Sequence, residues 1–263
     1  MSHTAKLNPL HFESADFAPK YYDSHTDGPV LVLLHGTFGS TAGNFGLIYQ
    51  ALSSDFRVIG LDFQEPDAKT LEIEDLVAQT LALVDGLGLA QAHVLGYSQG
   101  AVAAAAFAGS HPQRVDKLVL LAGWLRPDAY LGLRHDVWHA LRAMGDDAGL
   151  RKFNTMSALS PEFVAGLSPA QLRATLNSIR FTSFGDKQME LNRRVDISAL
   201  VPRIQAPTLV LSCDNDMMIP PHLQQDLAAS IAGAQLKRLR GGHGIVFEDP
   251  DAVSAAVREF LLS

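Results

Sequence analysis

Short runs of apolar residues alternate along most of the chain with longer segments of helical periodicity. The runs are rich in Val, Leu and Ile, and they fall at residues 30–34, 57–61, 93–96, 117–121, 208–212 and 235–239. Apolar runs without strict polar alternation are typical of strands that helices cover on both faces. The pattern therefore predicts an α/β fold, with a mainly parallel central sheet flanked by helices.

Three of the intervening segments have clear helical signals. Residues 70–87 place apolar side chains at spacings of three and four, with glutamates in the first turn. Residues 99–110 are dominated by alanine, which permits close packing of a helix on a sheet, and a last helix is expected over residues 252–262. Apolar and aromatic pieces at residues 10–12 and 19–22 are compatible with an antiparallel edge pair.

The alternation of strands and helices stops between residues 124 and 196. This segment has the pattern of several short helices, and it is flanked by expected strands on both sides. An insertion of this kind favours a helical lid that belongs to the surrounding domain over an independent unit. We therefore expect one domain over residues 1–263, which is a common length for an α/β domain with one large sheet.

The pentapeptide Gly96-Tyr97-Ser98-Gln99-Gly100 lies between an expected strand and the alanine-rich helix. In this position a GxSxG sequence forms a sharp turn that exposes the serine hydroxyl, and the helix start adds free backbone N–H groups. The alternative is a glycine-bracketed turn with an incidental serine. Ser98 is the candidate nucleophile.

A serine hydroxyl needs a base, and the base needs an acid that orients it. Of the ten histidines, only His243 combines a position after an expected strand with a glycine-rich loop near the end of the chain. Asp214 and Asp216 both follow the expected strand at residues 208–212. Asp216 is the candidate acid, and Asp214 is its rival.

The sequence His35-Gly36-Thr37-Phe38 follows the first expected parallel strand. A loop at this point can supply backbone N–H groups to an oxyanion hole, together with the N–H of Gln99. Thr37 is the first candidate donor, and Phe38 is the alternative. His35 precedes the donors, so we expect it to shape the loop and not to act in catalysis.

From about residue 30 to its end, the chain resembles the α/β-hydrolase superfamily. Four segments carry the resemblance in the family's order: LVLLHGTFGS, VLGYSQGA, LVLSCDNDMMIPP and LRGGHGIVFEDP. The resemblance implies a serine nucleophile elbow with a catalytic triad, and it places the acid at Asp216. After the strand at residues 57–61, however, this chain has Asp-Phe-Gln-Glu-Pro-Asp where the family often has Asp-x-Arg-Gly-x-Gly. That loop borders the site in relatives, so the resemblance does not define the substrate.

These features predict a serine hydrolase that needs no cofactor and cleaves a carboxylic ester, thioester or lactone of a small, largely apolar molecule through an acyl-enzyme. A carbon-carbon bond hydrolase would use the same residues. A cofactor-free dioxygenase of this superfamily pairs a histidine with an acid after the strand that ends here at Leu121, but Ala122 and Gly123 follow. A non-catalytic protein that binds a small molecule is the alternative from another class.

Composition limits the possible partners. The net charge of −7 and the absence of long Lys or Arg runs argue against nucleic acid, and no apolar stretch approaches the length of a membrane span. We expect a cytoplasmic protein with a small-molecule substrate.

Cys213 is the only cysteine, so no disulfide can form within the chain. His135 and His139 have a metal-ligand spacing, but the glutamate of the HExxH zinc motif is missing, so no metal is expected.

Overall fold

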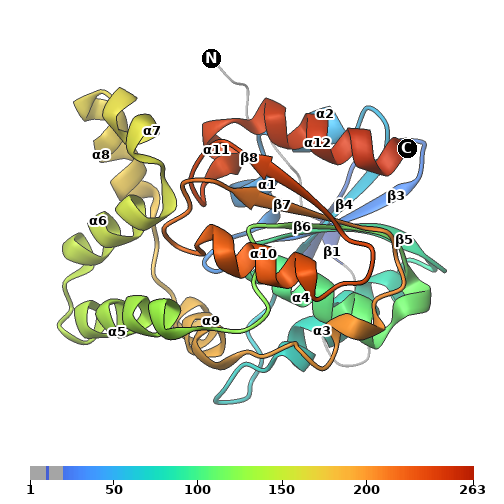
Figure 1. The fold of residues 1–263 in the computed structure, drawn as a ribbon, viewed down its shortest axis with the longest axis horizontal. Coiled ribbons are helices and arrows are strands. Elements are labelled where there is room, and N and C mark those ends of the chain that lie inside the picture. Colours follow the sequence, from blue (N-terminus) through green and yellow to red (C-terminus); the bar gives the residue numbers. More distant parts are fainter. Residues whose placement is uncertain (1–9, 12–19) are drawn as a thin grey trace.

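The structure, a computed structural model, describes residues 10–11 and 20–263. Its strands are β1 Leu10–His11, β2 Lys20–Asp23, β3 Val30–Leu34, β4 Arg57–Asp62, β5 Ala92–Tyr97, β6 Val115–Leu121, β7 Thr208–Cys213 and β8 Gln235–Leu239. They form one sheet in the order β1-β2-β4-β3-β5-β6-β7-β8 (Figure 1). β1 and β2 pair antiparallel, as do β2 and β4, and all pairs from β4 to β8 are parallel. The predicted α/β fold with a mainly parallel sheet is confirmed.

The N-terminal edge of the sheet matches the expected antiparallel pair in part. Leu10 lies opposite Tyr21, and β2 continues the sheet next to β4. The other residues of the expected pair, within 12–19, lie outside the described residues.

One expectation about the strands was wrong. We expected every apolar run to be buried on both faces, but in β8 all residues except Leu239 are exposed. β8 is the last strand of the order and pairs only with β7 among the described strands, so helices cover it less completely. Its sequence, Gln-Leu-Lys-Arg-Leu, has the polar character that edge strands tolerate.

Helices cover both faces of the sheet (Figure 1). On one face lie α3 Ile73–Gly86, α4 Gln99–Ser110 and α10 Pro221–Ala229; on the other lie α1 Thr41–Phe45, α2 Tyr49–Leu52, α11 Ile245–Glu248 and α12 Pro250–Leu262. Within β3, Val32 and Leu34 belong to the first core, and Leu31 and Leu33 belong to the second. Every second residue of a strand points to the same face, so an unbroken apolar run fills two cores at once.

The chain between β6 and β7 forms the helices α5 Ala129–Ala143, α6 Asp147–Ala158, α7 Pro161–Gly166, α8 Pro169–Ser178 and α9 Ser183–Arg194. We call α5 to α9 the helical insertion. At each helix start a side-chain oxygen accepts a hydrogen bond from a backbone N–H group; these oxygens belong to Asp128, Asp146, Ser160, Ser168 and Thr182. The predicted short helices are therefore present. The assignment of this segment as a lid on a single domain stays a prediction.

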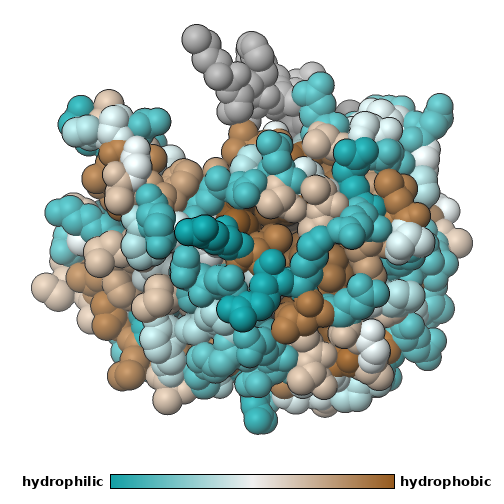
Figure 2. Space-filling view, turned by 45° about the horizontal axis from the view of Figure 1, so that its top comes forward, coloured by the Kyte–Doolittle hydropathy of each residue, from teal (hydrophilic) through white to brown (hydrophobic). Residues whose placement is uncertain are grey.

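The part of the insertion made by α7 and α8 stands away from the sheet (Figure 1). The space-filling view shows this arm beside the body, and hydrophobic and hydrophilic residues are interspersed on the visible face (Figure 2). In the described part of the chain, no helix combines the length and the apolar character that a membrane span requires.

Candidate active site

Ser98 lies in the turn between β5 and α4, with φ 57° and ψ −124°. This left-handed backbone conformation is unusual for a residue other than glycine. Both flanking positions require glycine because neighbouring backbone lies too close for a side chain. A Cβ on Gly96 would lie 2.2 Å from the backbone oxygen of Gly100, and a Cβ on Gly100 would lie 2.0 Å from the backbone oxygen of Leu34. The GxSxG sequence therefore forms the predicted strained strand-to-helix turn.

Ser98, His243 and Asp216 form one hydrogen-bonded row, although they are far apart in the sequence. Ser98 Oγ lies 2.8 Å from His243 Nε2, and His243 Nδ1 lies 2.8 Å from Asp216 Oδ2. A carboxylate can only accept, so Nδ1 carries the imidazole proton and Nε2 is free to accept the serine proton. All three residues are buried, Asp216 almost completely. The structure brings together the three residues that the sequence predicted as nucleophile, base and acid.

The surroundings of the two aspartates distinguish them. Asp216 Oδ1 accepts from the backbone N–H groups of Met218 and Ile219 at 2.8 and 2.7 Å, and Oδ2 also accepts from Gln224 Nε2 at 3.1 Å. These donors fix the direction of the carboxylate toward His243. Asp214 instead pairs with Arg238 near the surface, 2.6 Å away, so it does not belong to the row.

The loop that carries His243 is fixed on both sides. The Tyr97 hydroxyl donates to the His243 carbonyl oxygen at 2.9 Å. The Glu248 carboxylate accepts from Ser160 Oγ at 2.6 Å and from Gly242 N at 3.2 Å. Since Ser160 caps α7, the helical insertion is tied directly to the histidine loop.

The loop after β3 lies against the Ser98 turn. His35 Nδ1 donates to the Gly36 carbonyl at 2.8 Å, and Nε2 accepts from Phe63 N–H at 3.0 Å. This arrangement requires a neutral imidazole, and burial lowers the pKa of His35 accordingly. His35 thus holds the loop in shape and does not contact the hydrogen-bonded row through these bonds, as the sequence led us to expect.

The three candidate oxyanion donors differ in their hydrogen bonds. The N–H of Phe38 donates to Gln188 Oε1 at 3.0 Å. By contrast, no group within residues 20–263 accepts a hydrogen bond from the N–H of Thr37 or of Gln99. Thr37 and Gln99 therefore have N–H groups available beside Ser98, and Phe38 does not.

A chain of hydrogen bonds with one direction surrounds these donors, and no sequence motif indicated it. Gln188 accepts from Phe38 N–H and donates to Gln99 Oε1 at 2.8 Å; Gln99 donates to Asn192 Oδ1 at 2.6 Å. Asn192 then donates to Thr37 Oγ1 at 2.8 Å. The chain begins and ends on the loop after β3, and its two amides from α9 are buried. A helix of the insertion thereby fixes both Thr37 and Gln99.

We expect replacement of Gln188 by leucine to lower kcat by about 10-fold, because removal of an oxyanion donor itself costs about 10² to 10³ and Gln188 acts only through the loop. Initial rates on an activated ester measure the effect, and Gln188→Glu, which keeps an acceptor for Phe38 N–H, should recover part of it. A Gln188→Leu variant with unchanged kcat would show that this chain of bonds does not position the donors.

The histidine pair on α5 lies within the helical insertion. The rings of His135 and His139 are 6.4 Å apart between centroids. Burial and, next, the charge of Arg134 lower the pKa of His135 to about 3, so this imidazole is neutral. No cluster of three or more metal-ligating side chains occurs among the residues placed by the structure.

Because the sequence from His135 to His139 lacks the glutamate of the HExxH motif, we expect dialysis against a chelator to leave hydrolytic activity unchanged. The measurement is the rate on an activated ester before and after dialysis. A loss of activity that added zinc restores would contradict this expectation.

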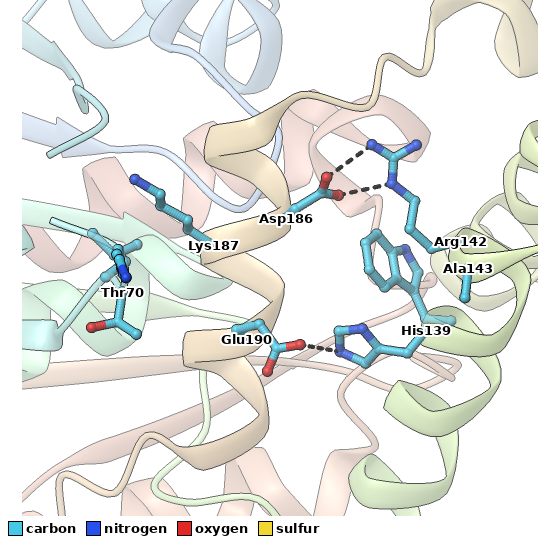
Figure 3. Close-up of a pocket in the computed structure, with 10 residues that line it drawn as sticks. Thr70, His139, Arg142, Ala143, Asp186, Lys187 and Glu190 are labelled. Atoms are coloured by element: carbon cyan, nitrogen blue, oxygen red, sulfur yellow. Dashed lines mark hydrogen bonds and ion pairs between the residues drawn. The ribbon is translucent and has the colours of Figure 1, made fainter. Parts of the chain in front are cut away.

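A cavity of about 390 Å³ opens between α5, α9 and the segment that precedes α3 (Figure 3). Two pairs of its lining side chains lie within ion-pair distance: Arg142 with Asp186 at 2.8 Å, and His139 with Glu190 at 3.3 Å. Residues 69–71 line it on the other side, after the loop that departs from the family sequence. Ser98, Asp216 and His243 do not line this cavity, so it is separate from the hydrogen-bonded row.

Comparison with known proteins identifies the family. The sequence model of the α/β hydrolase fold family matches residues 29–250. The chain is 30% identical to pyrrolizixenacetamide deacetylase from Xenorhabdus hominickii, over 90% of this chain and 92% of that protein. It is 31% identical to RutD from Caulobacter sp. (strain K31), proposed to be a carbamate hydrolase, over 92% of this chain and 95% of that protein. The protein belongs to the α/β hydrolase family.

Solved structures agree with this fold. MGS-M2, an α/β hydrolase enzyme from a Medee basin deep-sea metagenome library, matches with a TM-score of 0.86 at 21% sequence identity, over 97% of this chain and 98% of that chain. The similarity extends over nearly the whole of both chains, so the two proteins share the overall fold.

Proposed function

We propose that this α/β hydrolase cleaves a carboxylic ester, thioester or lactone of a small, largely apolar molecule through an acyl-enzyme intermediate. One observation carries the proposal: His243 lies 2.8 Å from both Ser98 Oγ and Asp216 Oδ2, and Ser98 lies in a strained turn at the start of α4. Such a row makes a serine hydroxyl nucleophilic at neutral pH.

In the first step, Ser98 Oγ attacks the carbonyl carbon while His243 Nε2 takes the serine proton. Asp216 remains ionised and stabilises the imidazolium through its hydrogen bond from Nδ1. The oxyanion forms hydrogen bonds to the N–H groups of Thr37 and Gln99, and the start of α4 adds its dipole. When the carbonyl re-forms, the bond to the leaving oxygen or sulfur breaks, and the leaving atom takes the proton from His243.

In the second step, water replaces the leaving group. His243 Nε2 removes a proton from the water as its oxygen attacks the acyl carbon, and the same N–H groups bind the second oxyanion. The bond to Ser98 Oγ then breaks, Oγ recovers the proton from His243, and the acid product leaves. The two steps need no cofactor.

Hydrolysis of an amide or carbamate is the second candidate. The names of two relatives, a deacetylase and a proposed carbamate hydrolase, favour it. The same row can catalyse either reaction, because each passes through a tetrahedral oxyanion, so the choice depends on the substrate pocket. Carbon-carbon bond hydrolysis would also use this row. A cofactor-free dioxygenase lacks support, since Ala122 and Gly123 follow β6.

The test is a substrate screen with purified protein. The panel contains 4-nitrophenyl esters of increasing chain length, acyl thioesters, lactones, amides and carbamates. We expect wild type to hydrolyse members of at least one of these classes, and we expect this hydrolysis to be lost in Ser98→Ala. Measurement of kcat/KM across the panel ranks the substrate classes. Activity restricted to diketones with carbon-carbon cleavage would overturn the ester proposal, and ligand binding without any turnover would overturn catalysis altogether.

A further inference from the structure

Arg134, on α5, is a buried arginine without a hydrogen-bonded partner. Its exposed fraction is 9%. No hydrogen bond or ion pair joins its guanidinium to any residue that the structure describes, and its Nε is fully buried. The recorded contact of the guanidinium is with the ring of Phe153, whose centroid is 5.9 Å away. Burial of a cation without an acceptor is costly, which calls for an explanation other than stability.

The other arginines of the insertion that form ion pairs show the usual arrangement. Arg142 pairs with Asp186, Arg193 pairs with Asp136 at 2.7 Å, and Arg194 pairs with Glu72. Each of these side chains is at least 31% exposed. Arg134 therefore differs from its neighbours both in burial and in having no acceptor.

Two residues of α5, one helical turn before Arg134 and one turn after it, make contacts that show where Arg134 lies. One turn earlier, the Tyr130 hydroxyl donates to the carbonyl of Met217, next to Asp216, at 2.9 Å. One turn later, the Trp138 ring lies 6.0 Å from the ring of Phe38, in the loop that carries the candidate oxyanion donors. Residues four apart share a helix face and are separated by about 6 Å along the axis. Arg134 thus lies on α5 between a residue that contacts the acid loop and a residue that contacts the oxyanion loop, close enough to Asp216 to feel its charge.

Among the described residues, the charged and titratable groups next to Arg134 form no hydrogen bond with its guanidinium. Asp216 attracts the guanidinium electrostatically, but its two oxygens already accept four hydrogen bonds, from Met218, Ile219, Gln224 and His243. The neighbouring His135 is neutral. Burial lowers the pKa of Arg134 to about 10, opposed by the charge of Asp216, so the guanidinium stays protonated at neutral pH. The donors of Arg134 are left for a group that the chain itself does not provide.

We propose that Arg134 binds a carboxylate on the substrate, at a distance from the bond that is cleaved. The planar guanidinium donates two parallel hydrogen bonds to a carboxylate, and burial strengthens this pairing. The substrate is then an ester, thioester, lactone or amide whose largely apolar skeleton carries one negative charge. The inference rests on the proposed function, because it assigns a substrate class to the same Ser98 site.

The experiment compares two series of activated esters that differ in this charge. One series contains 4-nitrophenyl monoesters of the linear dicarboxylic acids from glutaric to suberic acid, and the other contains 4-nitrophenyl esters of monocarboxylic acids of matched length. We expect wild-type kcat/KM to favour the charged ester by at least 10-fold at one chain length. In Arg134→Gln this ratio should fall by about 10- to 100-fold, because the charged ester loses its carboxylate partner and the neutral ester does not.

Arg193→Gln is the matched control. It removes the same charge from the neighbouring α9, but its partner is the exposed Asp136 and it has no place in the proposed site. This variant should keep the wild-type ratio. Arg134→Lys, which retains the charge without the planar fork, should keep part of the preference and provides a second variant if Arg134→Gln fails to fold.

The outcomes separate this inference from the proposed function. Two results would overturn the role of Arg134 and leave the role of Ser98 intact. In the first, wild type hydrolyses neutral esters and shows no preference for charged esters. In the second, wild type prefers charged esters, but Arg134→Gln and Arg134→Lys both leave that preference unchanged. Equal loss on both series in the Arg134 variants would assign Arg134 to packing against Phe153. Failure of wild type on every ester, together with no labelling of Ser98 by a fluorophosphonate, would overturn the proposed function and this inference with it.

Discussion

Replacement of Ser98 by alanine is expected to lower kcat by about 10³-fold or more, leaving only what positioning and oxyanion stabilisation supply. The residue is the sole nucleophile in the proposed mechanism, and His243 has no other hydroxyl within its recorded hydrogen bonds in the described chain. Steady-state kinetics on the best ester of the substrate screen measure the loss.

Ser212→Ala is the matched control for this variant. Ser212 is fully buried in β7, and its hydroxyl has no hydrogen-bond partner in the part of the chain that the structure describes, so its removal should leave kcat nearly unchanged. Full activity of Ser98→Ala would exclude the acyl-enzyme and would favour a mechanism in which His243 acts without a serine.

Asp216→Asn should lower kcat by about 10⁴-fold, because an amide in place of the carboxylate favours the wrong tautomer of His243. The asparagine side chain can donate to Nδ1, and Nε2 would then carry the proton and could not accept one from Ser98. The effect should lie in kcat more than in KM, since Asp216 does not contact the substrate in the proposed mechanism.

Asp214→Asn provides the comparison. Asp214 lies two residues away in the same loop but pairs with Arg238 near the surface, so we expect its replacement to change kcat by less than about 2-fold. If Asp214→Asn were the more damaging substitution, the acid would have been assigned to the wrong carboxylate.

The sheet could be predicted from the sequence because its strands are buried on both faces and carry an unbroken apolar pattern. The pattern of β8 was the exception: an edge strand needs fewer apolar residues, and Lys237 and Arg238 point to solvent. The four-residue helices α2 and α11 escaped prediction because one turn is too short to establish a 3.6-residue period.

Some residues of the candidate site could likewise be predicted from the sequence, and others could not. Ser98, His243 and Asp216 could be found because each belongs to a local motif at the end of a strand. Gln188 and Asn192 could not be found, since a polar residue on a short helix has the same pattern whether it faces solvent or another amide. Arg134 was missed for this reason too: only burial distinguishes it from an ordinary surface arginine.

The central claim, that Ser98 is the covalent nucleophile, is tested most directly by labelling with a fluorophosphonate and mapping the adduct by mass spectrometry. In the proposed mechanism the reaction requires His243 to activate the hydroxyl and the N–H groups of Thr37 and Gln99 to stabilise the adduct, so it reports on the whole site. We predict one adduct on the peptide that contains Ser98, absent in Ser98→Ala. An unlabelled wild-type protein that nevertheless hydrolyses esters, or an adduct on another residue, would contradict the account.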